Sequence, residues 1–350
     1  MKKIFTILLC ACLFFAAPGG CSLSTRDDSV SSDEHIDNAS GSARDAVPKN
    51  DSEESVDKIS VISTIFTPYD FIRQIAGDKA EITMLLPPGS ESHSYEPTPQ
   101  DIIKIQNCDV FVYVGGDSDT WVREVLDSMD MGKMKIITLM DCVDVVEEEI
   151  VEGMEDGHGH SYGEENEHEE DSHEHETDEH VWTSPKNAKI IVQKISEALC
   201  GTDPINAVLY KQNADAYISQ LDELDAKFQA VVDNAVRRTL VFGDRFPFRY
   251  FADAYGLAYF AAFPGCSAET EASAATVAFL IDKIKTEGIP VVFHVELSNR
   301  KMANTIGEET GARVLLLHAC HNVTKDEMSE GAGYIDLMNQ NVENLKEALR

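Results

Sequence analysis

The chain of 350 residues is long enough for roughly two domains of ~150 residues each. Its hydrophobic content of 43% is sufficient for a sizeable core, which excludes a small disulfide scaffold. Sixty-two Asp and Glu residues against 29 Lys and Arg give a formal net charge of −33, which repels phosphate backbones and excludes nucleic acid as a partner. Cations are the favoured partners.

The N-terminus has the features of an export signal. Lys2 and Lys3 precede an apolar run, Ile4 to Ala17, that is too short for the ~20 residues of a membrane helix but fits the core of a signal peptide. The small residues before Cys21 resemble the cleavage site of a bacterial lipoprotein. We therefore predict a signal peptide over residues 1–20 and a lipid anchor on Cys21, which places the protein outside the cytoplasm on the bacterial cell membrane.

Two alternatives remain open for this signal. A lipoprotein site at Leu9, Cys10, Ala11 and Cys12 fits the letters better, but it would leave a very short signal. In the other alternative, Cys21 follows an ordinary cleaved signal and carries no lipid. The intact mass of the mature protein distinguishes the three forms.

Composition and hydrophobic pattern divide the rest of the chain. Residues 21–57 hold hardly any large apolar side chain, which predicts a disordered tether. Beyond them, short β-branched runs alternate with segments of helical period, which predicts βαβ units and a mainly parallel sheet. We expect an N-terminal α/β lobe over 58–185 with an acidic loop at 147–179, connecting helices over 186–236, and a C-terminal α/β lobe over 237–350.

Each lobe is expected to contain four strands separated by helices. The strands are expected near Ile59–Ile65, Glu81–Leu86, Val110–Val114, Lys135–Thr138, Thr239–Phe242, Ala258–Phe263, Pro290–Val295 and Arg313–Leu317. The helices between them are expected near Tyr69–Ala76, Gln100–Asn107, Trp121–Met129, Phe248–Tyr255, Ala272–Glu287, Lys301–Thr310 and Tyr334–Ala348. In the connecting region, an apolar stripe predicts a short helix followed by one long helix, Asn206 to Val236.

Five cysteines follow Cys21, and none has the C-x-x-C spacing of a structural zinc site. Their odd number leaves at least one unpaired. Because an exported protein can form disulfides, Cys266 and Cys320 are a candidate pair, since each follows a predicted strand of the C-terminal lobe.

Histidines are concentrated in the acidic loop. The segment from Glu147 to His180 contains sixteen Asp or Glu residues and no Lys or Arg. Acid alone would indicate a solvated insertion, but neutral imidazole is a ligand suited to zinc, copper and nickel. We expect the irregularly spaced histidines to bind several ions weakly beside a tighter site. These auxiliary residues are His158, His160, His168, His173 and His175.

Two further histidines lie in specific motifs. His93 follows a predicted strand and is flanked by prolines, in a loop at the carboxyl end where doubly wound sheets bind ligands. The first motif, G-x-x-x-H-x-Y-E-P-T-P-x-D, extends from Gly89 to Asp101. The second, D-x-H-x-W-x-S-P-x-N, extends from Asp178 to Asn187 and contains His180.

These motifs resemble those of zinc- and manganese-binding receptors of bacterial ABC importers. The resemblance covers the chain after the tether and includes the acidic loop, the connecting region and a C-terminal Y-x-x-L-M-x-x-N-V-x-x-L. It implies two α/β lobes that bind one ion between them, with His93 and His180 as ligands, and delivery of the ion to a membrane permease. Since nitrogen ligands favour zinc over manganese, we expect zinc.

The second half departs from the family pattern. Where the family has a third histidine, this chain has Gly243 followed by Asp244. The family's fourth ligand is an Asp after the last strand, and here His318 takes that place, with His321 three residues later. We therefore expect His318 to bind the metal, and keep His321 and Asp244 as candidates to complete the site.

Other polar residues of the pattern receive supporting roles. His294 and Glu296 lie on the same face of a predicted strand, and we expect His294 to be a buried residue with satisfied hydrogen bonds. Glu96 or Glu271 could orient the ligand imidazoles.

The sequence therefore predicts a monomeric, lipid-anchored receptor that passes zinc to an ABC permease and is not an enzyme. One alternative is an envelope zinc hydrolase, although the chain has no H-E-x-x-H and no G-x-S-x-G motif. Another is a metal-buffering or adhesin lipoprotein that works without a permease.

Overall fold

The computed structural model describes residues 58–91, 95–130, 132–154, 177–267 and 271–350. The predicted signal peptide, the lipid anchor on Cys21, the tether and His93 lie outside these ranges. So do the auxiliary histidines His158, His160, His168, His173 and His175. Among the described helices, none combines the length and the apolar character that crossing a membrane requires.

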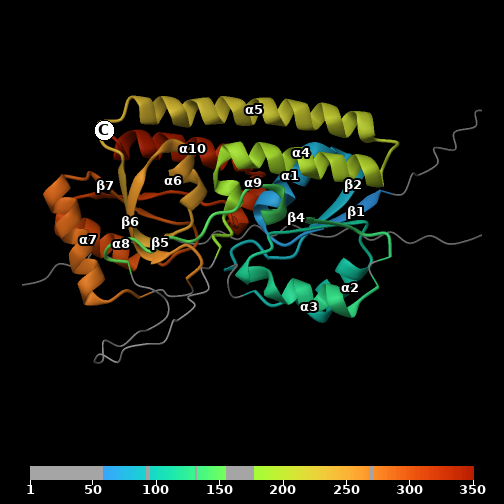
Figure 1. Cartoon of the computed structure of the whole chain (residues 1–350), viewed down its shortest axis with the longest axis horizontal. Coiled ribbons are helices and arrows are strands. Elements are labelled where there is room, and N and C mark those ends of the chain that lie inside the picture. The colour runs from blue at the N-terminus through green and yellow to red at the C-terminus, as the bar shows by residue number, and fades with distance from the viewer. Residues whose placement is uncertain (1–57, 92–94, 131, 155–176, 268–270) are drawn as a thin grey trace, which may run out of the picture. The chain divides into compact units, whose positions relative to one another are not determined.

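The first of two parallel sheets lies in the N-terminal half (Figure 1). Its strands are β1 (Ile59–Ser63), β2 (Ala80–Met84), β3 (Val110–Tyr113) and β4 (Lys135–Thr138), in the order β2-β1-β3-β4. Its helices are α1 (Phe66–Ala76), α2 (Pro99–Gln106) and α3 (Thr120–Ser128), with short 3-10 helices η1 (Gly77–Lys79), η2 (Asp117–Asp119) and η3 (Met140–Cys142). Val110, Phe111 and Val112 of β3 are fully buried, as expected for a central strand covered on both faces.

The second sheet repeats this plan. Its strands are β5 (Thr239–Phe246), β6 (Ala258–Pro264), β7 (Val291–His294) and β8 (Arg313–Leu316), parallel and in the order β6-β5-β7-β8. Its helices are α6 (Arg249–Tyr255), α7 (Ala274–Glu287), α8 (Lys301–Thr310), α9 (Lys325–Glu330) and α10 (Tyr334–Ala348). The predicted class, two α/β lobes with parallel sheets, is confirmed.

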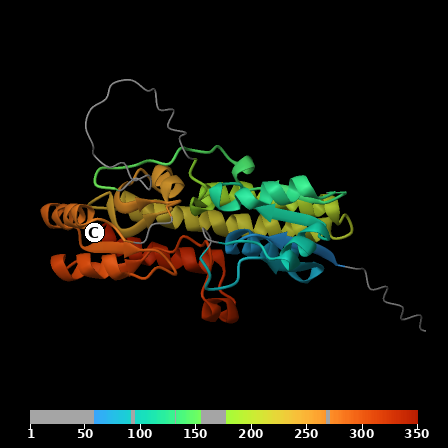
Figure 2. The same ribbon diagram turned by 90° about the horizontal axis from the view of Figure 1, so that it is seen from below.

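Two helices connect the lobes, α4 (Pro185–Thr202), after the 3-10 helix η4 (Val181–Thr183), and α5 (Ala207–Asp233). They pack side by side, and α5 also contacts α1 of the first lobe and α10 of the second (Figures 1 and 2). The long helix predicted from the apolar stripe is confirmed. The first connecting helix is longer than expected, because it continues through Gly201 and ends only before Asp203 and Pro204.

A buried carboxylate fixes α5 to both lobes. Asp70 of α1 is fully buried and accepts a hydrogen bond from the Tyr217 hydroxyl of α5 at 3.3 Å. It also accepts one from the backbone N–H of Tyr334, the first residue of α10, at 2.8 Å. Arg73 neutralises its charge at 2.6 Å. Since an unpaired buried charge is costly, this network disfavours separation of the three helices.

The candidate disulfide between Cys266 and Cys320 is not formed among the described residues. Cys266 and Cys320 are free, as are the other three described cysteines. The two residues follow β6 and β8, which form opposite edges of the second sheet, so that the sheet separates them. The sequence correctly placed each cysteine after a strand but could not give the strand order.

Candidate metal site

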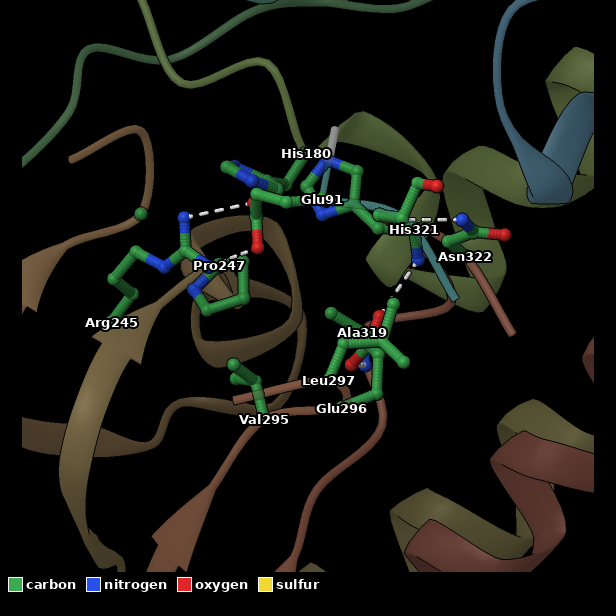
Figure 3. A pocket seen from close by; sticks show the side chains of 12 residues that line it. Glu91, His180, Arg245, Pro247, Val295, Glu296, Leu297, Ala319, His321 and Asn322 are labelled. Atoms are coloured by element: carbon green, nitrogen blue, oxygen red, sulfur yellow. Dashed lines mark hydrogen bonds and ion pairs between the residues drawn. The ribbon is translucent and has the colours of Figure 1, made fainter. Parts of the chain in front are cut away.

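A small cavity lies where loops from the carboxyl ends of strands in both sheets meet (Figure 3). In each sheet, the strand order reverses beside the first strand, at the kind of position where doubly wound sheets bind ligands. The cavity has a volume of about 20 Å³, enough for a single ion or water. Its lining comprises Ser90, Glu91, His180, Arg245, Pro247, Gly265, Val295, Glu296, Leu297, Ala319, His321 and Asn322.

Three residues in this region could hold a metal ion together. Glu179, His180 and His321 each offer a ligand atom, and these atoms lie within 4.8 Å of one another. The rings of His180 and His321 are 4.7 Å apart between centroids and nearly perpendicular. Trp182 packs against both rings, with its ring centroid 5.6 Å from that of His180 and 4.8 Å from that of His321. Two imidazoles from distant segments of the chain therefore converge on one place.

Asp178 holds both the backbone and the ring of His180. The Asp178 carboxylate accepts the backbone N–H of His180 at 2.8 Å, and the same oxygen lies 3.0 Å from ring atom Nδ1. Because an ionised carboxylate only accepts, Nδ1 carries the proton and Nε2 is the atom that would bind a metal. Burial alone would lower the pKa of His180, but the charge of Asp178 and its hydrogen bond, with the charges of Glu179 and Glu148, raise that pKa.

Glu179 approaches the two imidazoles from a buried position. Its carboxylate accepts the backbone N–H of Ser118 at 3.1 Å and also the Ser118 hydroxyl. The close approach requires glycine at position 116, since a Cβ there would overlap the carboxylate. The sequence analysis missed Glu179 because the second motif leaves this position unspecified. The signal that could have found it is a charged residue immediately before a ligand histidine in a segment that folds into the core.

A second buried acid lies behind Glu179. Asp119 accepts the backbone N–H groups of Val114 at 2.7 Å and Gly115 at 3.3 Å. Burial, assisted by the charge of Glu179, raises the pKa of Asp119 to about 7, while the two backbone hydrogen bonds act in the opposite direction.

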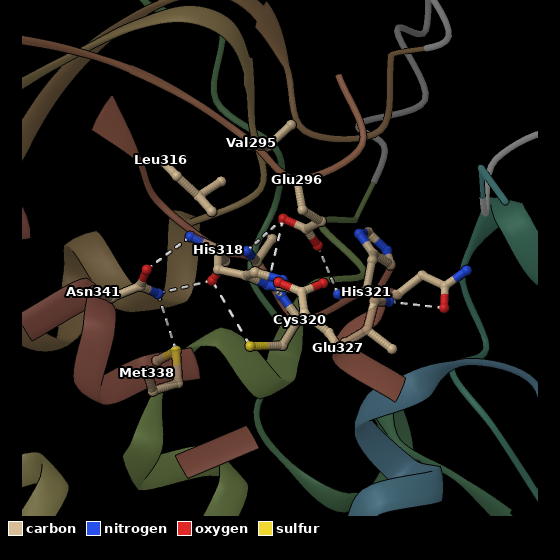
Figure 4. Close-up of polar contacts among 12 residues, drawn as sticks. Val295, Glu296, Leu316, His318, Cys320, His321, Glu327, Met338 and Asn341 are labelled. Atoms are coloured by element: carbon tan, nitrogen blue, oxygen red, sulfur yellow. Dashed lines mark hydrogen bonds and ion pairs between the residues drawn. The ribbon is translucent and has the colours of Figure 1, made fainter. Parts of the chain in front are cut away.

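The turn after β8 carries His321, and side chains hold its backbone (Figure 4). Glu296 accepts the N–H of Ala319 at 2.7 Å with one oxygen and the N–H of His321 at 2.9 Å with the other. The N–H between them, that of Cys320, donates to Nδ1 of His318 at 2.9 Å. These contacts hold Cys320 at φ +60, a left-handed conformation that non-glycine residues seldom adopt.

His318 itself lies outside the group of candidate ligands. Its Nδ1 is used by the turn, and its buried Nε2 has no hydrogen-bond partner among the residues that the structure describes. Asn341 clamps its backbone, donating to the carbonyl and accepting from the N–H, both at 2.8 Å. The structure therefore brings His321 to His180 and leaves His318 inside the turn.

The remaining sequence candidates also have structural contacts. Asp244 accepts the backbone N–H of Arg245 at 2.9 Å and that of Val295 at 3.2 Å, so it joins β5 to the end of β7. His294 is buried, and its Nδ1 lies 2.8 Å from the carbonyl of Val295, as expected for a satisfied residue. Burial lowers its pKa.

The described contacts of His180 and His321 involve other acids than the two suggested from the sequence. Glu96 and Glu271 are exposed. Asp178 and Glu296 perform this role, the first through a ring nitrogen and the second through the backbone. Glu296 reaches its turn from 25 positions away, a contact that sequence spacing does not reveal.

Two parallel-sheet lobes joined by a long helix, with histidines meeting in a cavity between the sheets, define a solute receptor of the metal-binding type. The family described as "Zinc-uptake complex component A periplasmic" matches residues 61–348, and the chain belongs to that family. This confirms the resemblance drawn from the motifs. Since the family consists of receptors, the hydrolase alternative is not favoured.

Individual relatives support this assignment. The chain is 34% identical over 306 residues to the high-affinity zinc uptake system protein ZnuA of Bacillus subtilis, covering 86% of this chain and 91% of that protein. It is 33% identical to the zinc-binding lipoprotein AdcA of Streptococcus pneumoniae, covering 83% of this chain but only 56% of AdcA.

Solved structures give the same result. The metal-dependent lipoprotein YcdH of Bacillus subtilis superimposes with a TM-score of 0.69 at 31% identity, over 84% of this chain and all of that one. The Zn(II)-bound ZnuA-like domain of Streptococcus pneumoniae AdcA superimposes with a TM-score of 0.67 at 30% identity, over 84% of this chain and 99% of that one.

Proposed function

We propose that the protein captures one zinc ion in the cavity between its lobes and delivers it to an ABC permease for uptake. One observation carries this proposal: the ligand atoms of Glu179, His180 and His321 lie within 4.8 Å of one another, and the two histidines line a cavity with room for one ion. The names of ZnuA and AdcA, a zinc uptake protein and a zinc-binding lipoprotein, agree with it.

The proposed ligands are Nε2 of His180, one nitrogen of His321 and the carboxylate of Glu179, with His93 of the first motif as the fourth. His321 thus replaces His318 as the ligand from the turn after β8. Imidazole and carboxylate are donors that zinc accepts in a four-coordinate shell, whereas manganese prefers more oxygen ligands. This donor set therefore favours zinc over manganese.

The protein acts outside the cytoplasm as a monomer, held at the membrane by a lipid on Cys21. The anchor rests on the sequence around Cys21, and the name of the AdcA lipoprotein agrees with it. The histidines of the acidic loop collect further zinc ions weakly beside the tight site.

The test is a zinc titration of the metal-free protein against a chelator of known affinity, with His180→Ala in parallel. We expect one tight ion per chain that is lost in the variant. Growth of the producing bacterium under zinc limitation should depend on the gene and fail with the same variant. Absence of tight binding would contradict the proposal, and tight binding without a growth requirement would favour a metal buffer.

A further inference from the structure

A cationic side chain lines this cation-binding cavity. Arg245 belongs to β5, and only 13% of its side chain is exposed. It shares the cavity lining with His180 and His321. A guanidinium is always charged and repels a nearby divalent cation, so its presence lowers metal affinity unless it makes another contribution.

The contacts of Arg245 show what that contribution is (Figure 3). Its two terminal nitrogens donate to both carboxylate oxygens of Glu91, at 3.2 and 3.0 Å. One of them also donates to the carbonyl of Ser267 at 3.2 Å. Asp244 fixes the backbone of Arg245, since it accepts the N–H of Arg245 and that of Val295. The paired geometry with the carboxylate is one that Arg makes and Lys cannot.

Glu91 belongs to the loop that follows β2 of the first lobe. Asn322 holds the backbone just before Glu91, since it donates to the carbonyls of Pro87 at 2.8 Å and Ser90 at 2.9 Å. Asn322 belongs to the turn after β8, and the guanidinium partner of Glu91 belongs to β5. The N–H of Gly89 also donates to the carbonyl of Val323 at 2.8 Å. The turn after β8 therefore holds the backbone of this loop, and the ion pair is a separate attachment to β5 at the rim, where 40% of the Glu91 side chain is exposed.

We propose that Arg245 is a positioning residue for metal retention: its ion pair with Glu91 latches the loop of the first lobe onto the second lobe and slows release of the ion. This inference rests on the proposed function. The latch joins the two walls of the cavity without contributing a ligand, and its carboxylate offsets the charge of the guanidinium.

Replacing Arg245 distinguishes a latch from a simple charge. Arg245→Met keeps much of the side-chain length and removes the charge. If Arg245 acted only by repelling the ion, this change would slow zinc dissociation. A latch predicts faster zinc dissociation instead. Glu91→Gln should also accelerate dissociation, and the double variant should be no faster than Arg245→Met alone, because either change breaks the same contact.

The experiment measures the zinc dissociation rate of the full chain, after mixing with excess chelator in a stopped-flow instrument. Arg245→Met and Glu91→Gln should each accelerate dissociation about tenfold, and Arg245→Lys less. Arg313→Met is the matched control, since it removes an arginine that is 65% exposed and pairs with Glu347 away from the cavity. Its rate should equal that of the unmodified protein.

An unchanged or slower rate in Arg245→Met, or additive effects in the double variant, would overturn the latch. If the unmodified protein retains no zinc, the proposed function fails instead, so the two failures are distinguishable. Far-ultraviolet circular dichroism of each variant verifies that the chain is folded.

Discussion

His180 and His321 reach the cavity from two segments, one before α4 and one after β8, and these segments hold their histidines differently. Asp178 binds the ring of His180 directly, so a contact to the imidazole sets its orientation. Glu296 binds the backbone around His321 and does so through two N–H groups, so the shape of the turn sets the direction of that side chain.

The charges around the cavity are also uneven. Beside His180 lie Asp178, Glu179 and Glu148, whose charges raise the pKa of His180. Arg245, which lines the cavity from β5, is paired with Glu91. A histidine that is proposed to bind metal can thus be oriented through its ring or through its backbone, and we expect the two cases to respond differently to substitution. The predictions below follow decreasing effect on zinc affinity.

The largest effect is expected from removing either imidazole. His180→Ala and His321→Ala should each weaken zinc binding more than ~100-fold, because changes to groups that merely orient a ligand already weaken metal binding by ~10–100-fold. A competition titration measures both constants. If one variant binds as tightly as the unmodified protein, that histidine is not a ligand, and the two segments are not equivalent partners in the site.

The next largest effects are expected from replacing Asp178, which holds the ring of His180, and Glu296, which holds the backbone of His321. Asp178→Asn keeps an acceptor for the ring and backbone of His180 but loses the charge, whereas Glu296→Gln leaves one turn N–H facing an amide N–H. We expect ~10–100-fold weaker zinc binding for the first. The second should bind about tenfold more weakly and also lose about 1–3 kcal/mol of unfolding free energy.

Affinity and urea denaturation measured on the same preparations separate the two cases. A loss of stability in Asp178→Asn with none in Glu296→Gln would reverse the comparison.

His318→Asn provides the test of which histidine of the turn is the ligand. The Asn amide oxygen can replace Nδ1 of His318 as acceptor for the N–H of Cys320, so the turn should survive. Zinc affinity should change less than about threefold, because His318 is not a proposed ligand and the turn that directs His321 keeps its hydrogen bond. A loss as large as that of His321→Ala would return His318 to the ligand set.

The smallest effect on zinc affinity is expected at Asp119, which should alter stability instead. Its pKa is about 7 in the folded chain and 3.8 ordinarily, so the folded state binds the proton more tightly. The associated stability is full below pH 3.8 and is lost as the pH rises through 7. In the unmodified protein, the unfolding free energy should fall by on the order of 2–4 kcal/mol between pH 3.8 and 7 because of Asp119. Asp119→Asn should remove this fall. Parallel pH dependences in both proteins would contradict this.

The sequence predicted the fold well, and it singled out His180, which the structure places at the cavity; the reasons are local. Strand and helix periods, together with the motif Asp178 to Asn187, specify both lobes and one ligand segment without knowledge of tertiary contacts. The first motif contains a helix start: Thr98 and Asp101 form a capping box with Pro99 at the first position of α2.

The choice between His318 and His321 could not be predicted in this way. It depends on Glu296, whose position beside the turn follows from the pairing of β7 with β8. The Arg245–Glu91 pair likewise depends on the approach of the two lobes. The separation of Cys266 from Cys320 depends on the strand order of the second sheet. These features arise from contacts between distant segments, which one sequence does not specify.

The most direct test of the account is a crystal structure of the zinc-loaded protein with anomalous diffraction data at the zinc absorption edge. We predict one strong peak in the cavity, bonded to His180 and His321 at about 2.0–2.1 Å from each ring nitrogen. A peak on Nε2 of His318, or no peak between His180 and His321, would contradict it.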